Sequence, residues 1–433
     1  MNVNRNEEIM LLASKSGVGI YRWKICAMLF LATTINFVDR QVLGILAPQL
    51  QKEFAWSDSE YGFIVSSFQA AYALGFLIMG HLLDKIGTRL GATIAIGFWS
   101  VATMMHALVA SLFGFAAVRF LLGLGEAGNF PSALKAVSEW FPRKERALAT
   151  GIFVSGASVG AIVAPLTVPF IAINYGWQMT FVITGAIGFI WIVFWMMMYR
   201  LPQDHPKLGK AELEYITSDP LEPQIKIPWL HLLKYRQTWA FAFGAFMTHP
   251  IFSFFLFFLP KFFFSNYGIG IAKIGPILIV IYLMSDFGSI IGGWASSALI
   301  KRGWSVNKSR KTTMFASALC VVPVYYAAQT TELWLAVGLI GLALAAHSAW
   351  SANLFTLTTD MFPRQVVGSV VGIGSMLGAV GGMFGATIGG FLLQTTGSYV
   401  SLFIFAGCAY LIAFTGIQLL SPKLKSISLE KII

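Results

Sequence analysis

Apolar runs of about 20 residues recur along the whole chain, and short polar segments separate them. A helix of that length crosses the ~30 Å hydrocarbon core of a bilayer. The pattern predicts an all-α membrane protein with twelve transmembrane helices. Their expected bounds are 23–45, 60–83, 91–110, 112–137, 148–172, 178–199, 238–265, 273–300, 312–329, 333–359, 367–393 and 398–420.

The longest polar segment contains five prolines and divides the apolar runs six and six. Polar, proline-rich stretches of this kind are typical of boundaries between structural units. We therefore expect two six-helix bundles joined by a linker. The expected regions are an N-terminal tail (1–22), an N-terminal bundle (23–200), a linker (201–237), a C-terminal bundle (238–420) and a C-terminal tail (421–433).

A short run of residues repeats between the two halves. Glu139-Trp-Phe-Pro-Arg143 recurs as Asp360-Met-Phe-Pro-Arg364, and the same offset along the chain relates Gly160 to Gly381. An acidic residue two positions before Phe-Pro-Arg, with aligned glycines, is better explained by duplication than by chance. Duplicated halves with a substrate site between them, near the bilayer midplane, are typical of secondary transporters.

The composition excludes a soluble protein. The chain is 57% hydrophobic and only 11% charged, with a mean hydropathy of +0.72, whereas soluble chains carry about 25% charged residues. The three cysteines lie far apart without metal-binding spacing, so we expect no metal and no cofactor. The polar N-terminal tail does not resemble a cleavable signal peptide.

The positive charges lie mainly on one side of the predicted membrane. With the N-terminus in the cytoplasm, 24 of the 30 Lys and Arg residues are cytoplasmic and three are on the opposite side. This bias predicts a multi-pass protein of the cell membrane, a bacterial inner membrane in particular, with both termini in the cytoplasm. The net charge of +11 therefore reflects a bilayer partner and not a nucleic acid.

Ionisable side chains inside two predicted helices are candidates for function, because burying charge in a bilayer is costly. Asp39 and Arg40 lie in the first helix, and Arg119 and Glu126 lie two helical turns apart in the fourth. One interpretation is that these residues are neutralising pairs that only hold the bundle together. The other is that the carboxyl groups take up protons while an arginine, whose planar fork suits a carboxylate, binds an anion.

A loop between the second and third predicted helices reads Gly80-His-Leu-Leu-Asp84-Lys85-Ile-Gly87-Thr-Arg89. It is similar, at every defined position, to the G-x-x-x-D-[RK]-x-G-x-[RK] signature of the major facilitator superfamily. Glycines permit a tight turn, and an acid can meet a helix N-terminus or a basic side chain. The resemblance implies a gate that latches the cytoplasmic side in the outward-open state.

Longer runs resemble the anion:cation symporter family of that superfamily. The N-terminal runs are Asn36-Phe-Val-Asp39-Arg40 and Arg119-Phe-Leu-Leu-Gly-Leu-Gly-Glu126. The C-terminal half resembles the hexuronate (glucuronate and galacturonate) transporter branch in Phe255-Leu-Phe-Phe-Leu-Pro260-Lys261, Asp286-Phe-Gly-Ser-Ile-Ile-Gly-Gly293, Lys301-Arg-Gly-Trp-Ser-Val-Asn-Lys308 and Trp350-Ser-Ala-Asn353-Leu-Phe-Thr356. The resemblance spans residues 20–420, nearly the whole chain.

The resemblance assigns roles to matching positions. It implies that Asp39 and Glu126 are the proton-linked acids, that Arg40 binds the substrate carboxylate and that Arg119 interacts with the acids. It further implies substrate contacts for an aromatic hydroxyl in the second helix and an amide in the tenth. These two residues are Tyr72 and Asn353. Further candidates are Asn36, His249, Asp286, Ser351 and Thr356.

The chain departs from its relatives at several of these places. Phe37 stands where some relatives have Tyr, and residues 156–158 read Gly-Ala-Ser where galactonate-type relatives have Gln. His249 precedes Pro250 where hexuronate relatives have Asp. His249 either senses pH or is a satisfied interfacial histidine. Asp286 either binds sugar hydroxyls or caps a local helix bend.

These observations together predict a secondary active transporter, functional as a monomer, that imports a sugar-acid anion by proton symport with alternating access. A hexuronate is the expected substrate, and the alternatives are an aldonate, an aldarate or an aromatic carboxylate. Export is disfavoured because the fifth helix lacks the G-P-x-x-x-G-G signature of exporters. A non-transporting sensor is disfavoured because no signalling domain is attached, and no motif of an enzyme stands in a suitable context.

Overall fold

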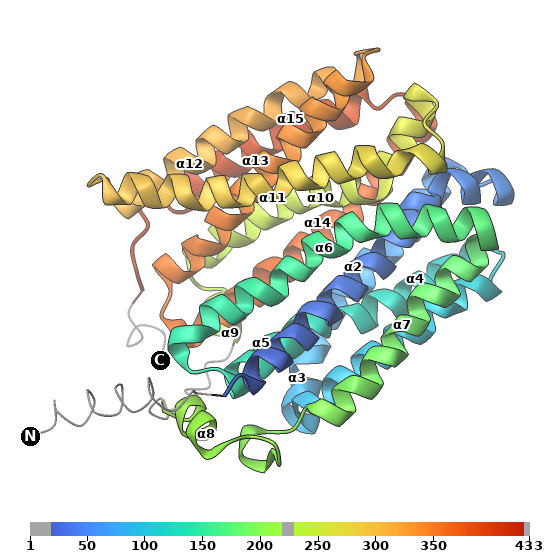
Figure 1. The fold of residues 1–433 in the computed structure, drawn as a ribbon. Helices are drawn as coiled ribbons and strands as arrows, with labels where there is room; N and C mark the ends of the chain where they lie inside the picture. Colours follow the sequence, from blue (N-terminus) through green and yellow to red (C-terminus); the bar gives the residue numbers. More distant parts are fainter. Residues whose placement is uncertain (1–18, 219–228, 428–433) are drawn as a thin grey trace, which may run out of the picture.

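The computed structural model describes residues 19–218 and 229–427, and all the regular elements in those ranges are helices. Figure 1 shows two bundles side by side. The N-terminal bundle contains α2 (Tyr21–Phe54), α3 (Asp58–Met105), η1 (His106–Leu108), α4 (Leu112–Glu126), α5 (Asn129–Trp140), α6 (Arg143–Tyr175) and α7 (Trp177–Met198). The C-terminal bundle contains α10 (Arg236–Tyr267), α11 (Ile271–Lys301), α12 (Val306–Val321), η3 (Val322–Ala328), α13 (Leu333–Met361), α14 (Arg364–Thr396) and α15 (Val400–Leu420). The segment between the bundles holds η2 (Pro202–Asp204), α8 (Lys210–Ile216) and α9 (Trp229–Leu232).

The predicted fold class, twelve helices in two six-helix bundles, is confirmed. Within the described ranges, nine helices are by themselves long and apolar enough to cross a membrane. The other three predicted spans, 60–83, 112–137 and 312–329, also lie on described helices. Each of these three departs from a plain apolar helix for a local reason.

The second and third predicted spans form one long element, α3, with a sharp bend at Gly87. Gly87 has φ 77° and ψ 164°, a conformation that an L side chain rarely adopts and that glycine permits. The bend separates the span that begins at Asp58 from the span that ends at Met105. A glycine in the loop motif thus supplies the turn that the sequence predicted there.

The fourth predicted span, 112–137, is interrupted in its middle. α4 ends at Glu126 and α5 begins at Asn129, so the predicted continuous helix was wrong in this detail. Gly125 and Gly128 flank the break, and glycine weakens a helix interior. A broken helix at membrane depth is tolerated where protein surrounds it, and here the break lies beside a candidate acid.

The ninth predicted span changes its geometry near its end. α12 passes into the 3₁₀ helix η3 at Val322, one residue before Pro323. Proline has no N–H to donate and disfavours continuation of an α-helix. The span therefore consists of two shorter pieces.

The repeated Phe-Pro-Arg run makes the same backbone turn in both halves. Phe141 has φ −123° and ψ 133°, and Phe362 has φ −121° and ψ 147°. Pro142 and Pro363 then start the next helix with φ −64° and −61°. The sequence offset between the halves therefore matches positions in three dimensions across this turn.

Small residues let helices approach closely within each bundle. A Cβ atom added at Gly156 in α6 would collide with the carbonyl oxygen of Phe30 in α2. An added Cβ at Gly381 in α14 would likewise collide with the carbonyl oxygen of Phe246 in α10. Corresponding helix pairs of the two halves thus pack in the same way.

The two bundles are joined by polar contacts at the end where α2 meets α3. Asp58 forms an ion pair with Lys261 of α10, and its N–H donates to Oε1 of Gln394 in α14 at 2.9 Å. The hydroxyl of Tyr61 donates to the carbonyl oxygen of Phe257 at 2.7 Å. We call this end, with Asp58 and Lys261, the closed end.

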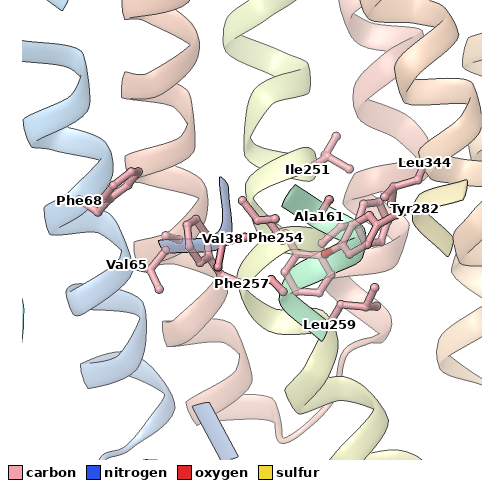
Figure 2. Packing of buried hydrophobic residues seen from close by; sticks show 14 of the residues in the cluster. Val38, Val65, Phe68, Ala161, Ile251, Phe254, Phe257, Leu259, Tyr282 and Leu344 are labelled. Carbon is pink, nitrogen blue, oxygen red and sulfur yellow. The ribbon is translucent and has the colours of Figure 1, made fainter. Parts of the chain in front are cut away.

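Apolar side chains continue the contact toward the middle of the molecule. Figure 2 shows Val65 and Phe68 of α3 and Ala161 of α6 in the cluster that also contains Phe257 and Tyr282 of the other bundle. Near the starts of α6 and α14, added Cβ atoms at Gly151, Gly368 and Gly372 would meet nothing within 4 Å.

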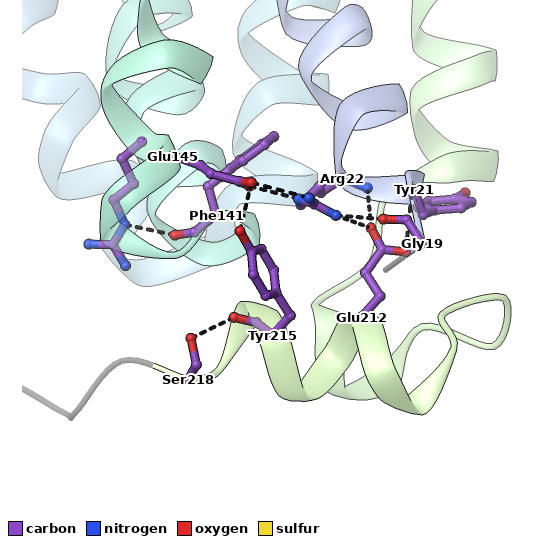
Figure 3. Close-up of polar contacts among 9 residues, drawn as sticks. Gly19, Tyr21, Arg22, Phe141, Glu145, Glu212, Tyr215 and Ser218 are labelled. Atoms are coloured by element: carbon purple, nitrogen blue, oxygen red, sulfur yellow. Dashed lines mark hydrogen bonds and ion pairs between the residues drawn. The ribbon is translucent and has the colours of Figure 1, made fainter. Parts of the chain in front are cut away.

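The segment between the bundles is anchored to the N-terminal bundle (Figure 3). Arg22 at the start of α2 lies between Glu145 of α6, at 2.8 Å, and Glu212 of α8, at 3.1 Å. Glu212 also accepts hydrogen bonds from the N–H groups of Tyr21 and Arg22. The pKa of the Tyr215 phenol is raised to about 12 by burial and by its hydrogen bond to Glu145, so the phenol stays protonated and donates.

Candidate functional site

Arg40 of α2 and Glu126 of α4 form an ion pair at the centre of the N-terminal bundle. Nε and Nη2 of Arg40 lie 2.8 Å and 2.7 Å from the same oxygen, Oε2 of Glu126. The other carboxylate oxygen, Oε1, is buried without a hydrogen-bond partner. One carboxylate oxygen of this buried pair can therefore still accept a hydrogen bond.

Arg40 is also the member of the charged group that reaches the surface of the site. Its residue is 8% exposed, whereas Asp39, Arg119 and Glu126 are 0% exposed. An incoming anion would meet Arg40 first, because the other three groups lie behind protein atoms.

Aromatic rings surround the Arg40 guanidinium. Its central carbon lies 4.7 Å from the ring centre of Tyr72, 4.9 Å from that of Phe37 and 5.2 Å from that of Phe68. Nη2 also donates to the side-chain oxygen of Asn36 at 3.3 Å. These contacts hold the fork in one orientation, which favours recognition of a planar carboxylate.

Arg119 is fully buried and contacts the backbone of Arg40. Its Nη2 donates to the backbone carbonyl of Arg40 at 3.1 Å, and its guanidinium lies 5.6 Å from the ring of Phe68 and 5.8 Å from that of Phe257 in the other bundle. Nε and Nη1 are buried without hydrogen-bond partners. Arg119 therefore contributes positive charge to both acids without a direct ion pair to either.

Asp39 is fully buried, and neither of its carboxyl oxygens has a hydrogen-bond partner. Thr184, Trp99 and Arg119 lie beside it, but Thr184 and Trp99 make no well-formed hydrogen bond to it. A bare carboxylate is costly in such a place. This geometry suits a group that gains and loses a proton as its surroundings change.

The C-terminal candidates do not gather around Arg40 in the same way. The Asn353 amide is 1% exposed, and it donates to the carbonyl oxygens of Gly292 at 3.1 Å and Ala349 at 2.9 Å. The Thr356 hydroxyl donates to the carbonyl of Asn353 in its own helix. In this conformation Asn353 joins α13 to α11, and Thr356 bonds only within α13.

Asp286 and His249 lie at the boundary between the bundles. The hydroxyl of Ser158 in α6 donates to Oδ1 of Asp286 in α11 at 2.5 Å, so Asp286 has a partner in the other half. His249 of α10 is half-buried. Within the described residues its ring nitrogens have no hydrogen-bond partner, and its ring lies 6.2 Å from that of Phe252.

A buried histidine in α13 was not among the residues predicted from the sequence. Nδ1 of His347 lies 2.5 Å from the hydroxyl of Tyr410, and Nε2 lies 3.3 Å from the hydroxyl of Ser351. Its ring stacks on Phe252 at 5.1 Å between centroids. The signal was present in the sequence, because His347 is an ionisable residue inside an apolar run, one helical turn before a serine on the same helix face.

The gate loop contacts the N-terminal bundle through its described side chains. The hydroxyl of Thr88 donates to Glu139 at 2.8 Å, and Arg89 donates to the carbonyl of Met196 in α7. Lys85 is exposed. The side chain of Asp84, and likewise Gly80, lies outside the described residues.

A cavity of about 290 Å³ lies between α2, α10 and α11, but it does not include the charged group. Its lining is largely apolar, with Gln49 and Lys52 as its polar members. Nor do the described residues contain a group of three or more His, Cys, Asp or Glu side chains placed to hold a metal ion. We therefore place the candidate site at Arg40.

Both the sequence and the fold are similar to those of known proteins. The sequence pattern of the Major Facilitator Superfamily matches residues 29–386. The hexuronate transporter of Escherichia coli (strain K12) is 32% identical over 383 residues, which cover 87% of this chain and 88% of that protein. The galacturonate transporter of Dickeya chrysanthemi is 33% identical over 310 residues, 70% of this chain and 89% of that protein.

A solved structure is also similar. A bacterial homolog of the human lysosomal transporter Spinster, in an inward-facing and occupied conformation, matches with a TM-score of 0.73. The match covers 94% of this chain and 98% of that chain, at 22% sequence identity. At this identity the likeness concerns the fold alone.

Proposed function

Because the chain belongs to the Major Facilitator Superfamily, in the branch that contains the hexuronate transporters, we propose that it imports a hexuronate together with protons. The protein is a multi-pass membrane transporter. The single observation that carries the proposal is the Arg40–Glu126 pair, in which the arginine is partly exposed and the acid is not.

The pair suggests how an anion and a proton are coupled. A substrate carboxylate that approaches Arg40 competes with Glu126 for the same guanidinium fork. If the substrate wins, Glu126 loses its cation, and a bare carboxylate at 0% exposure takes up a proton. Anion binding and proton binding would then favour each other, which is the thermodynamic requirement for symport.

Asp39 offers a second place for a proton, because its oxygens are buried without partners. Two protons carried with one monoanion would make the translocated complex positive by one charge. A membrane potential negative inside would then contribute about 2.3 kcal/mol per 100 mV to uptake.

The orientation is part of the proposal. If both termini lie in the cytoplasm, the closed end with Asp58 and Lys261 faces outward. The site in this conformation would communicate with the cytoplasm. Alternating access would require the contacts of the closed end to break while the gate loop closes the opposite side.

Uptake into proteoliposomes tests the function. With an imposed pH gradient, acid outside, labelled glucuronate or galacturonate should accumulate above the outside concentration, and a proton-conducting ionophore should abolish the accumulation. Parallel binding measurements with gluconate, galactonate, glucarate and phthalate separate the alternative substrates. Binding of phthalate with no binding of any sugar acid would contradict a sugar-acid carrier.

Thiol labelling tests the orientation. In a background with Cys320 and Cys408 replaced by serine, a membrane-impermeant reagent added outside cells should label Lys52→Cys and not Lys210→Cys. Both positions are exposed, so access depends on the side of the membrane. The opposite labelling pattern would overturn the orientation.

A further inference from the structure

The duplication relates Glu126 to a residue of the other half that has no assigned role. The repeated run aligns Glu139 with Asp360, and the same offset places His347 where the first half has Glu126. The two stretches lead into the same Phe-Pro turn with closely similar backbone angles. His347 therefore occupies, in α13, the position from which Glu126 faces the site in α4.

The two positions also have related neighbours. Glu126 contacts α2, the first helix of its half, through Arg40. His347 contacts α10, the first helix of its own half, through the ring of Phe252 at 5.1 Å between centroids. Where the first half uses an ion pair, the second half uses a histidine stacked on an aromatic ring.

Hydrogen bonds fix the ring of His347 on both sides. Tyr410 of α15, at 2.5 Å, occupies Nδ1, and Ser351, at 3.3 Å, occupies Nε2. Whichever nitrogen carries the proton, the Ser351 hydroxyl uses one of its three hydrogen-bonding positions here and keeps the others free. Ser351 is half-buried, whereas Tyr410 is fully buried.

His249 belongs to the same cluster, because its ring lies 6.2 Å from that of Phe252, on which the ring of His347 stacks. Its ring nitrogens have no hydrogen-bond partner among the described residues. A neutral hydroxyl group is the ligand that suits both an unpaired imidazole and a free serine hydroxyl, since each can donate or accept.

We propose that His249 and Ser351 bind the hydroxyl groups of the substrate, opposite the carboxylate that Arg40 holds, and that His347 is the residue that positions Ser351. The inference rests on the proposed function and adds the residues that bind the hydroxyl groups of the substrate. Tyr410 forms a hydrogen bond with His347 and so affects the site indirectly. The two bundles would thus bind opposite ends of the substrate.

Binding by the purified protein tests the proposal with three probes. D-glucuronate and D-galacturonate differ only in the configuration at C4, and cyclohexanecarboxylate has the carboxylate without the hydroxyls. His249→Ala and Ser351→Ala should each raise Kd for the better hexuronate about tenfold. Kd for cyclohexanecarboxylate should stay within about twofold, and the Kd ratio of the two epimers should move toward one.

Tyr410→Phe and His347→Gln test the positioning role, and His347→Gln does so without leaving a cavity. Both should reduce the discrimination between the epimers, while His249→Gln, which can still donate and accept, should restore part of it. His231→Ala, at an exposed position in α9, is the matched control and should change nothing.

The outcomes separate the two proposals. Wild-type protein that binds cyclohexanecarboxylate but neither hexuronate would sink the proposed sugar-acid function. Wild-type protein that binds a hexuronate, with unchanged Kd and unchanged epimer ratio in folded His249→Ala and Ser351→Ala variants, would overturn this inference alone.

Discussion

The two bundles are built from the same repeated pattern but differ at their centres. The N-terminal bundle has two acids and two guanidinium groups at its centre. Arg40 is one of these four groups, and the other three are 0% exposed. The C-terminal bundle places His347 at the position that matches Glu126, hydrogen-bonded to Tyr410 and Ser351. One half is organised by charge and the other by hydrogen bonds.

The difference has a physical reason. Each buried charge costs several kcal/mol in a bilayer unless an opposite charge lies nearby. Concentrating both signs in one bundle lets them neutralise each other, and it leaves the other bundle free to carry uncharged polar groups. A substrate with an acid at one end and hydroxyls at the other would match such a division.

Arg40→Lys should have the largest effect on this division. Lysine keeps the charge but loses the fork that holds one oxygen of Glu126 with two nitrogens. We expect Kd for the substrate to rise more than about a hundredfold, measured by calorimetry on protein that still inserts. Arg310→Lys, which keeps its pairing with Asp360 inside the other bundle, should change Kd less than about threefold. Equal effects in both variants would contradict the special role of Arg40.

The second prediction concerns the acids. Asp39→Asn and Glu126→Gln imitate protonated carboxyl groups, so they should lose accumulation driven by a pH gradient, by about tenfold or more. At least one of them should keep exchange of labelled for unlabelled substrate without a gradient. Glu214→Gln, the same acid-to-amide change at an exposed position in α8, is the control. If both neutral variants accumulate substrate as wild type does, proton coupling does not depend on these acids. The N-terminal bundle would then only bind the anion.

Much of this picture could be predicted from the sequence because it depends on local signals. The lengths of the apolar runs predicted the helices. The ionisable side chains inside these runs made Arg40, Asp39 and Glu126 candidates for the site. The Phe-Pro repeat also predicted the related halves. The loop glycine Gly87 adopts the turn that its motif implied.

The rest depends on contacts between distant segments. The fixed ring of His347 requires Tyr410, 63 residues away, and the bond of Asp286 requires Ser158, 128 residues away. Asn353 matched a substrate contact by resemblance, yet here it binds backbone carbonyls of its own bundle. No pattern along one helix contains that information.

Substitutions at the closed end should change the position of one bundle relative to the other without disturbing the fold of either bundle. Asp58→Asn with Lys261→Gln removes the ion pair between α3 and α10. A partly exposed pair contributes about 1 kcal/mol or less, so we expect a population shift of a few-fold. Spin labels at Lys52→Cys and Lys273→Cys, in different bundles near this end, should gain a longer distance. Arg310→Gln, whose pairing lies within one bundle, should leave the distances unchanged.

The smallest effect on substrate binding is expected where the segment between the bundles anchors the N-terminal bundle alone. Glu212 is 3% exposed, pairs with Arg22 and accepts two backbone N–H groups at the start of α2. An acid at a helix N-terminus compensates unpaired N–H groups and the helix dipole. Glu212→Gln keeps the shape but removes the charge, so Arg22 retains only Glu145 as an ionic partner. We expect a loss of about 1–3 kcal/mol, seen as a fall of a few degrees in Tm, with Kd for the substrate unchanged. Glu214→Gln, two residues away and exposed, is the matched control and should leave Tm unaltered. A change in Kd without a change in Tm would instead mean that α8 communicates with Arg40, and the division of the molecule into an anion site and a separate anchor would be wrong.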